Sequence, residues 1–153
     1  MNYFCLKGEL ILNLGESIDE LSDPISLADT LESTGRLQDH GKLITFACAC
    51  CRLIYDKIPE TAQKSLVLAE EFVKGLASTN QLLDERVRLW RFLGKESCDF
   101  SSARVNAVRA VICCLYADTP PEEAYNSVLS LMEFCNDVEQ HRSQQCALMH
   151  QIF

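Results

Sequence analysis

The run from Leu43 to Tyr55 is apolar on almost every side, and it constrains the fold more than any other segment. Its residues favour an α-helix, and three of the chain's nine cysteines, Cys48, Cys50 and Cys51, lie within it. A helix that is apolar all round must be buried, because none of its sides is suited to contact with water. The rest of the chain is therefore expected to supply elements that surround this helix.

Those other elements are expected to be helices as well. Apolar residues recur at spacings of three and four throughout the chain, and strict alternation of apolar and polar residues is confined to residues 9–14. A chain of 153 residues can bury a substantial core without disulfide or metal staples. We predict an all-α fold, a compact bundle of about six helices that forms a single domain over residues 1–153, with residues 1–22 the least certain segment.

Start and stop signals give the expected limits of the helices. Asp23-Pro24 has the pattern of an N-cap followed by proline at the first helical position, and Pro59 ends the cysteine-rich helix because proline lacks an amide donor. The segment Thr119 to Glu122 has the pattern of a capping box. Helices are expected from Pro24 to Gly35, over residues 42–57, from Pro59 to about Ala77, from residues 78–80 to Gly94, from residues 101–102 to Leu115, and from residues 119–122 to Cys135. The last helix either runs to the C-terminus or breaks near Asn136-Asp137.

Two parts of the chain resemble each other. Cys50-Cys51, Pro59-Glu60 and Glu71-Phe72 recur as Cys113-Cys114, Pro121-Glu122 and Glu133-Phe134. Each part has the pattern of a buried helix, a turn marked by proline and an amphipathic helix. A duplicated helical hairpin is one explanation. The shared pattern of all helical hairpins is the other, and repeat arrays usually need three or more units.

The charge of the chain limits the class of its partners. It has 22 acidic and 14 basic side chains, which gives a formal net charge of −8. Binding to nucleic acid needs clustered lysine and arginine, and an anionic membrane surface repels an acidic protein, so we expect neither partner. The same charge suits a basic protein partner.

The cysteines and the N-terminal residues point to the cytoplasm. The first residues lack a basic segment followed by a long apolar run, which is the pattern of a signal peptide, and the apolar run at residues 10–14 is too short to span a bilayer. Nine cysteines is an odd number, whereas a complete disulfide framework needs an even one. We expect reduced thiols and a cytoplasmic location.

The cysteines allow two interpretations. Cys48, Cys51, Cys113 and Cys114 could supply four thiolates to a metal ion, which would make the protein metal- or thiol-dependent. However, no histidine lies at the spacing of a structural zinc site. Free cysteine is also among the most buried residue types, and the alanines between the cysteines favour close helix packing. We therefore favour a packing role and expect no cofactor.

One predicted helix carries candidates for contact with another protein. Arg86, Arg88, Trp90 and Arg91 lie close together on it, and arginine and tryptophan are enriched at binding hot spots. The acidic pair Glu70-Glu71 on the preceding helix is a further candidate. A surface helix with a single buried tryptophan is the commoner arrangement and is favoured here. No phosphate-binding loop, nucleophile elbow or zinc-protease motif is present, so we expect no catalytic residues and no enzyme.

Four segments resemble a widespread family of uncharacterised bacterial proteins. These are Asp23-Pro24, the run Gly41-Lys42-Leu43-Ile44-Thr45-Phe46-Ala47-Cys48-Ala49-Cys50-Cys51-Arg52-Leu53-Ile54-Tyr55, residues 69–77 and residues 144–153. The family is marked by a Lys-Leu-x-x-Phe-Ala-Cys-Ala-Cys-Cys-Arg helix and by a C-terminal Ile-Phe-Gly-Asn-Pro-Phe motif. Here the sequence stops at Ile152-Phe153, so the rest of that motif is missing. The resemblance implies a helical bacterial protein and brings no activity with it.

These observations favour a non-enzymatic protein-interaction domain. Small acidic chains without catalytic motifs are often immunity proteins or antitoxins, which neutralise basic toxins through complementary charge. The alternative is the metal- or thiol-dependent protein that would use the cysteine cluster.

Overall fold

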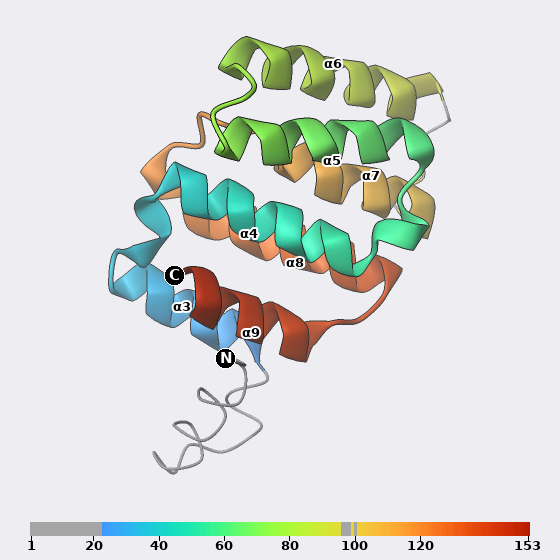
Figure 1. Ribbon diagram of the computed structural model, residues 1–153. Helices are drawn as coiled ribbons and strands as arrows, with labels where there is room; N and C mark the ends of the chain where they lie inside the picture. Colours follow the sequence, from blue (N-terminus) through green and yellow to red (C-terminus); the bar gives the residue numbers. More distant parts are fainter. Residues whose placement is uncertain (1–22, 96–98, 100) are drawn as a thin grey trace, which may run out of the picture.

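The computed structural model describes residues 23–95, 99 and 101–153 (Figure 1). The segment 1–22, which the sequence leaves least certain, lies outside the described residues. Seven α-helices and no strand are present in the described part, which confirms the predicted all-α fold. They are α3 (Pro24–Ser33), α4 (His40–Leu53), α5 (Glu60–Val73), α6 (Thr79–Lys95), α7 (Ala103–Cys113), α8 (Ala124–Val138) and α9 (Arg142–Ile152).

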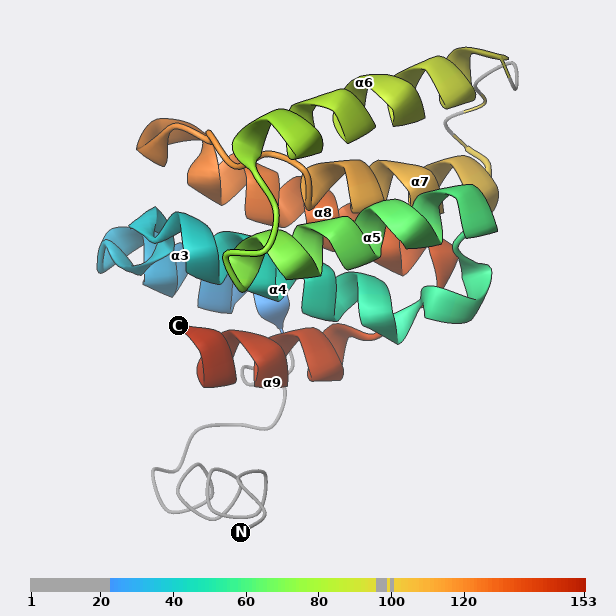
Figure 2. The same ribbon diagram turned by 45° about the horizontal axis from the view of Figure 1, so that its top comes forward.

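Successive helices run in opposite directions and form a layered bundle (Figures 1 and 2). Helix α4 lies at its centre, where it packs against α5, α7, α8 and α9. Helix α6 lies at the outer edge and packs mainly against α5 and α7. None of the helices in the described part of the chain is both long and apolar enough to cross a membrane.

Helix α4 is buried on more than one side, as its sequence predicts. Phe46, Cys50 and Cys51 have no exposed surface, although they point in different directions around the helix. The ring of Phe46 packs against the ring of Phe153, which follows α9, with 5.8 Å between the ring centroids. Cys51 faces α7 on another side. The central position of α4 follows from this burial, because its small side chains allow neighbouring helices to approach closely.

The helix N-termini agree with most of the predicted caps. The Asp23 carboxylate accepts a hydrogen bond from the Ile25 amide at 3.1 Å. Ser78 and Gln81 form a reciprocal pair, in which the Gln81 amide donates to Ser78 Oγ and the Ser78 amide donates to Gln81 Oε1. The Val105 amide donates to Ser102 Oγ at 3.5 Å. Side-chain oxygens therefore satisfy amides that the first turn of a helix leaves unpaired.

The predicted capping box at Thr119 is wrong. Thr119 Oγ1 donates to the backbone oxygen of Tyr116 at 3.5 Å instead of accepting from a helical amide. Pro120 has extended backbone angles, with a ψ of 147°. A short 3-10 helix over Pro121–Glu123 then precedes α8. Helix α8 begins at Ala124.

Several predicted helix ends differ from the structure. Helix α5 ends at Val73 instead of near Ala77. Helix α4 ends at Leu53, and a separate 3-10 turn over Tyr55–Lys57 replaces its predicted last turn. Helix α6 continues through Gly94 to Lys95. Helix α8 breaks after Val138, which agrees with a break near the predicted place and gives α9 as a separate helix.

The two predicted hairpins correspond to α4–α5 and α7–α8. Within each pair the helices pack together, and α4 also contacts α8 as α7 contacts α5. Helices α4 and α7 run antiparallel (Figure 1). Cys51 and Cys114 are equivalent in the predicted alignment, and their Sγ atoms lie 3.6 Å apart.

Candidate functional site

The cysteines form a thiol cluster in the core. It is centred on the 3.6 Å contact between Cys51 Sγ and Cys114 Sγ, with Cys48 beside Cys114 and Cys135 beside Cys51. All seven described cysteines are free thiols. Among the described residues, no group of three or more histidine, cysteine or acidic side chains is arranged to hold a metal ion.

The environment of the thiol cluster favours packing over reactivity. Burial raises the pKa of Cys114 well above its usual value. Hydrogen bonds from the Cys114 and Cys135 thiols act in the opposite direction on Cys51 and lower its pKa. Both Cys51 and Cys114 have no exposed surface, so a reagent reaches them only if the helices separate. Of the four predicted metal ligands, Cys48, Cys51 and Cys114 come together in this cluster.

The fourth predicted ligand, Cys113, is the last residue of α7. It lines a surface cleft and is only partly buried as a residue. Burial of its sulfur raises the pKa of Cys113 to about 12. Cys113 therefore stays a protonated thiol at neutral pH, which is a poor nucleophile and a poor metal ligand.

Arg88 connects α6 to α5. Its guanidinium donates to Glu85 Oε2 at 2.7 Å, to Ser65 Oγ at 2.9 Å and to the backbone oxygen of Thr61 at 3.0 Å. Ser65 Oγ in turn donates to Glu85 at 2.6 Å. Hydrogen bonds from Arg88 hold the pKa of Glu85 below its usual range. Arg88, a predicted contact residue, thus takes part in the packing of the bundle.

Two further predicted contact residues have partners within the chain. Arg52 donates two hydrogen bonds to the Glu70 carboxylate, at 2.7 and 2.6 Å, and its guanidinium lies over the Tyr55 ring. This ion pair lies at the edge of the core. Arg86 lies 4.0 Å from the centroid of the Tyr116 ring and 3.4 Å from Asp118. Glu71 is exposed on α5.

Trp90 is exposed, so the favoured prediction of a buried tryptophan is wrong. Leu83, Val87 and Trp90 form one line along the surface of α6. Their exposed fractions are 44%, 40% and 43%. The exposed side chains of Asp84 and Arg91 border them. We call these five residues the outer α6 face. Of the predicted contact residues, the outer α6 face includes Trp90 and Arg91, and it excludes Arg88, Glu70 and Glu71.

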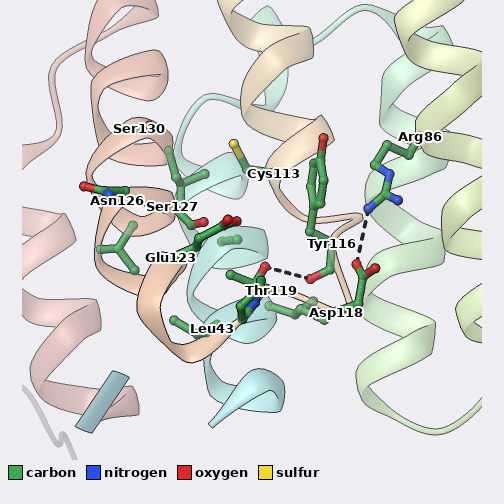
Figure 3. A pocket seen from close by; sticks show the side chains of 15 residues that line it. Leu43, Arg86, Cys113, Tyr116, Asp118, Thr119, Glu123, Asn126, Ser127 and Ser130 are labelled. Atoms are coloured by element: carbon green, nitrogen blue, oxygen red, sulfur yellow. Dashed lines mark hydrogen bonds and ion pairs between the residues drawn. The ribbon is translucent and has the colours of Figure 1, made fainter. Parts of the chain in front are cut away.

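A cleft of about 690 Å³ lies beside Arg86 (Figure 3). We call it the α4–α8 cleft. Its floor is apolar and comes from α4 and α8, and its rim is polar. The floor contains Leu43, Ile44, Ala47, Val128 and Leu131, and the rim contains Arg86, Tyr116, Asp118, Thr119, Glu123, Asn126, Ser127 and Ser130.

The rim of the α4–α8 cleft is acidic. Arg86 and Asp118 form an ion pair at one end, and the polar side chains of α8 lie on the opposite side (Figure 3). Because Asp118 neutralises Arg86, Glu123 adds an uncompensated negative charge. A cleft with an apolar floor, an acidic rim and a protonated thiol is suited to binding an apolar and basic group, and it offers no activated nucleophile.

Among the residues of this cleft, the sequence singled out Arg86 as a contact residue and Cys113 as a metal ligand. The others, such as Ser127, Asn126 and Tyr116, are ordinary residues at isolated positions, so no motif marks them. The one available signal was the polar, proline-containing link between α7 and α8, because binding residues often lie on such loops.

No protein-family model matches the chain, and neither a curated protein nor a solved structure matches it. The resemblance to the bacterial family that the cysteine-rich helix marks stays a prediction. It rests on the residues quoted for it. The function must therefore be argued from the geometry alone.

Proposed function

We propose that this chain is a non-enzymatic protein-interaction domain and that its α4–α8 cleft binds a basic, apolar segment of another protein. The observation that carries the proposal is the combination of an apolar floor with an acidic rim. Leu43 offers an apolar contact, while the carboxylate of Glu123 is placed to bind a lysine or arginine of the partner. Apolar contacts supply most of the affinity in such a cleft, and charges select the partner.

The charge of the whole chain supports the same class of partner. A net charge of −8 attracts a basic protein and speeds the encounter with it. An immunity protein or an antitoxin that neutralises a basic toxin is the specific form that we propose. In that role, occupation of the cleft by a toxin segment would hold the toxin inactive.

A cytoplasmic location is part of the proposal. Its support is that Cys51 and Cys114 lie close together and are both free thiols. Reduced thiols are typical of the cytoplasm.

The rival proposal is a metal- or thiol-dependent protein. The contact between Cys51 and Cys114, with Cys48 and Cys135 beside them, is the observation in its favour. Elemental analysis of the purified protein separates the two proposals, because stoichiometric zinc or iron would favour the rival.

The cleft proposal is tested with two labelled peptides of equal length, one with leucine and lysine in a helical pattern and one with leucine and glutamate. Fluorescence anisotropy should show that the lysine peptide binds at least about tenfold more tightly. The variants Ser127→Trp, which fills the cleft, and Glu123→Lys, which reverses a rim charge, should each weaken that binding by about tenfold.

Glu133→Lys is the matched control, because Glu133 is an exposed acidic residue of α8 that does not line the cleft. It should leave binding within about twofold of the wild type. If Glu133→Lys weakens binding as much as Glu123→Lys does, attraction to the overall charge explains the result. If Ser127→Trp has no effect, the cleft is not the binding site.

A further inference from the structure

Helix α6 carries two apolar lines, and only one of them faces the bundle. Leu82, Leu89 and Leu93 form the inner line and are at most 1% exposed. The outer line, Leu83, Val87 and Trp90, lies about 100° around the helix, since each residue advances by that angle. A helix at the edge of a bundle needs only the inner line for folding.

The charged residues beside the outer line change sign along the helix, from acidic near Leu83 to basic near Trp90. Asp84 is exposed next to Leu83, and Arg91 is exposed next to Trp90. Within residues 23–95, 99 and 101–153, neither side chain forms an ion pair or a side-chain hydrogen bond. Both lie on the same flank of the outer line, because they are separated by seven residues, or nearly two turns.

We infer that the outer α6 face binds a second copy of this chain, with the two α6 helices antiparallel about a two-fold axis near Val87. This inference goes beyond the proposed function, since it concerns a different surface and a different partner. Leu83 of one copy then lies beside Trp90 of the other, and Val87 packs against its own equivalent. The same flanks face each other in an antiparallel pair, as at corresponding flanking positions of coiled coils.

The charge pattern selects this arrangement. Antiparallel pairing brings Asp84 beside Arg91 of the second copy, and the two-fold axis repeats that pair. Parallel pairing would instead place the two equivalent flanks on opposite sides of the contact, so Asp84 and Arg91 would not meet across it. The outer α6 face is thus complementary to itself in one direction only.

Gly94 also lies on the outer line of α6. It follows Trp90 at the next position of the outer line, and a Cβ added at Gly94 would meet no atom within 4 Å. Packing within the chain therefore does not require glycine there. In the antiparallel pair, Gly94 lies opposite Asn80 of the second copy, near the end of the contact, where a small residue allows close approach.

The area of one helix face indicates a weak dimer. Interfaces of this size belong to the transient class, so we expect a dissociation constant of about 1–100 µM. Trp90 is the only tryptophan of the chain, which makes its emission a specific reporter of this face. Dimerisation should move its emission to shorter wavelength, because the half-exposed indole leaves water.

The test uses the full chain over a range of concentrations, with sedimentation velocity for mass and Trp90 emission for location. The wild type should change from 17.2 kDa to twice that mass as its concentration rises, together with the emission shift. Asp84→Arg and Arg91→Asp should each weaken the dimer by about tenfold, because two attractive contacts become repulsive. The double variant Asp84→Arg/Arg91→Asp should return to within about threefold of the wild type.

Glu133→Arg is the matched control, since it reverses an exposed charge on α8. It should leave the dissociation constant within about twofold. A wild type that stays monomeric at millimolar concentration overturns the inference. A dimer that the single variants do not weaken shows another interface, and a double variant that fails to recover overturns the antiparallel arrangement.

Discussion

Helices α4 and α6 both carry more apolar surface than one buried stripe needs, and they use it differently. In α4, residues on different sides, such as Phe46 and Cys51, are all in contact with neighbouring helices. In α6, the inner line is buried and the outer line with Trp90 remains exposed. Helix α4 is central and α6 lies at the edge, and this position decides what each helix can do.

The comparison shows that the reactivity of a side chain and its accessibility to solvent and partners are separate properties. The thiols of α4 have the more reactive side chains, but they are enclosed by helices on every side. The outer α6 face and the α4–α8 cleft have ordinary side chains that solvent and partners reach. The unusual residues of this chain thus stabilise its core, and the candidate contact surfaces consist of common ones.

Truncation of a large side chain should distinguish the two helices most strongly. Phe46→Ala in α4 should lower the free energy of unfolding by about 3–5 kcal/mol, because it removes a fully buried ring and leaves a cavity. Trp90→Ala in α6 should lower it by less than about 1 kcal/mol, because the indole is half exposed. Urea unfolding of both variants at low protein concentration measures the difference. Equal losses would mean that Trp90 is part of the core.

The link between α6 and α5 should make a smaller contribution that depends on pH. Glu85→Gln should cost about 1 kcal/mol at neutral pH, since it weakens the charged hydrogen bonds to Arg88 at a partly exposed site. The folded-state pKa of Glu85 is lowered, so its contribution is present above the unfolded-state pKa and is lost as the pH falls through the folded-state value.

The measurement is the difference in unfolding free energy between the wild type and Glu85→Gln across a series of pH values. The difference should shrink toward zero in acid. A difference that persists at a pH where Glu85 is protonated would show that the variant acts through packing and not through charge.

The smallest expected change is stabilising and lies on the outer line of α6. Gly94→Ala should raise the free energy of unfolding of the monomer by about 0.5–1 kcal/mol, because alanine has less freedom in the unfolded chain and its Cβ meets nothing within 4 Å. Thermal unfolding at low concentration measures it. A destabilised variant would indicate that a side chain at position 94 clashes with a neighbour within the chain.

The sequence was most informative where local signals act alone. The capping residues Asp23 and Ser102 and the apolar pattern of α4 are sufficient to place their helices, because each depends on neighbouring residues only. The prediction of a capping box at Thr119 was wrong, because the backbone at Pro120 is extended and not helical. Trp90 also misled, because whether a residue on an amphipathic helix is covered depends on which helices pack beside it.

The cleft could not be predicted for a related reason. Its floor and rim come from α4, α6, α8 and the link between α7 and α8, which lie far apart in the sequence. No spacing rule connects Leu43 with Ser127 or Arg86 with Asp118. Only their arrangement in space brings them together.

The central claim is that the cysteine-rich helix α4 forms the packing core and is not a reactive site. Timed labelling of the native protein with a thiol reagent, read at each cysteine by mass spectrometry, tests it most directly. Cys48, Cys51, Cys114 and Cys135 should stay unlabelled while the protein is folded and react together once urea unfolds it. Rapid labelling of Cys51 in the folded protein would contradict the claim and favour a thiol-dependent function.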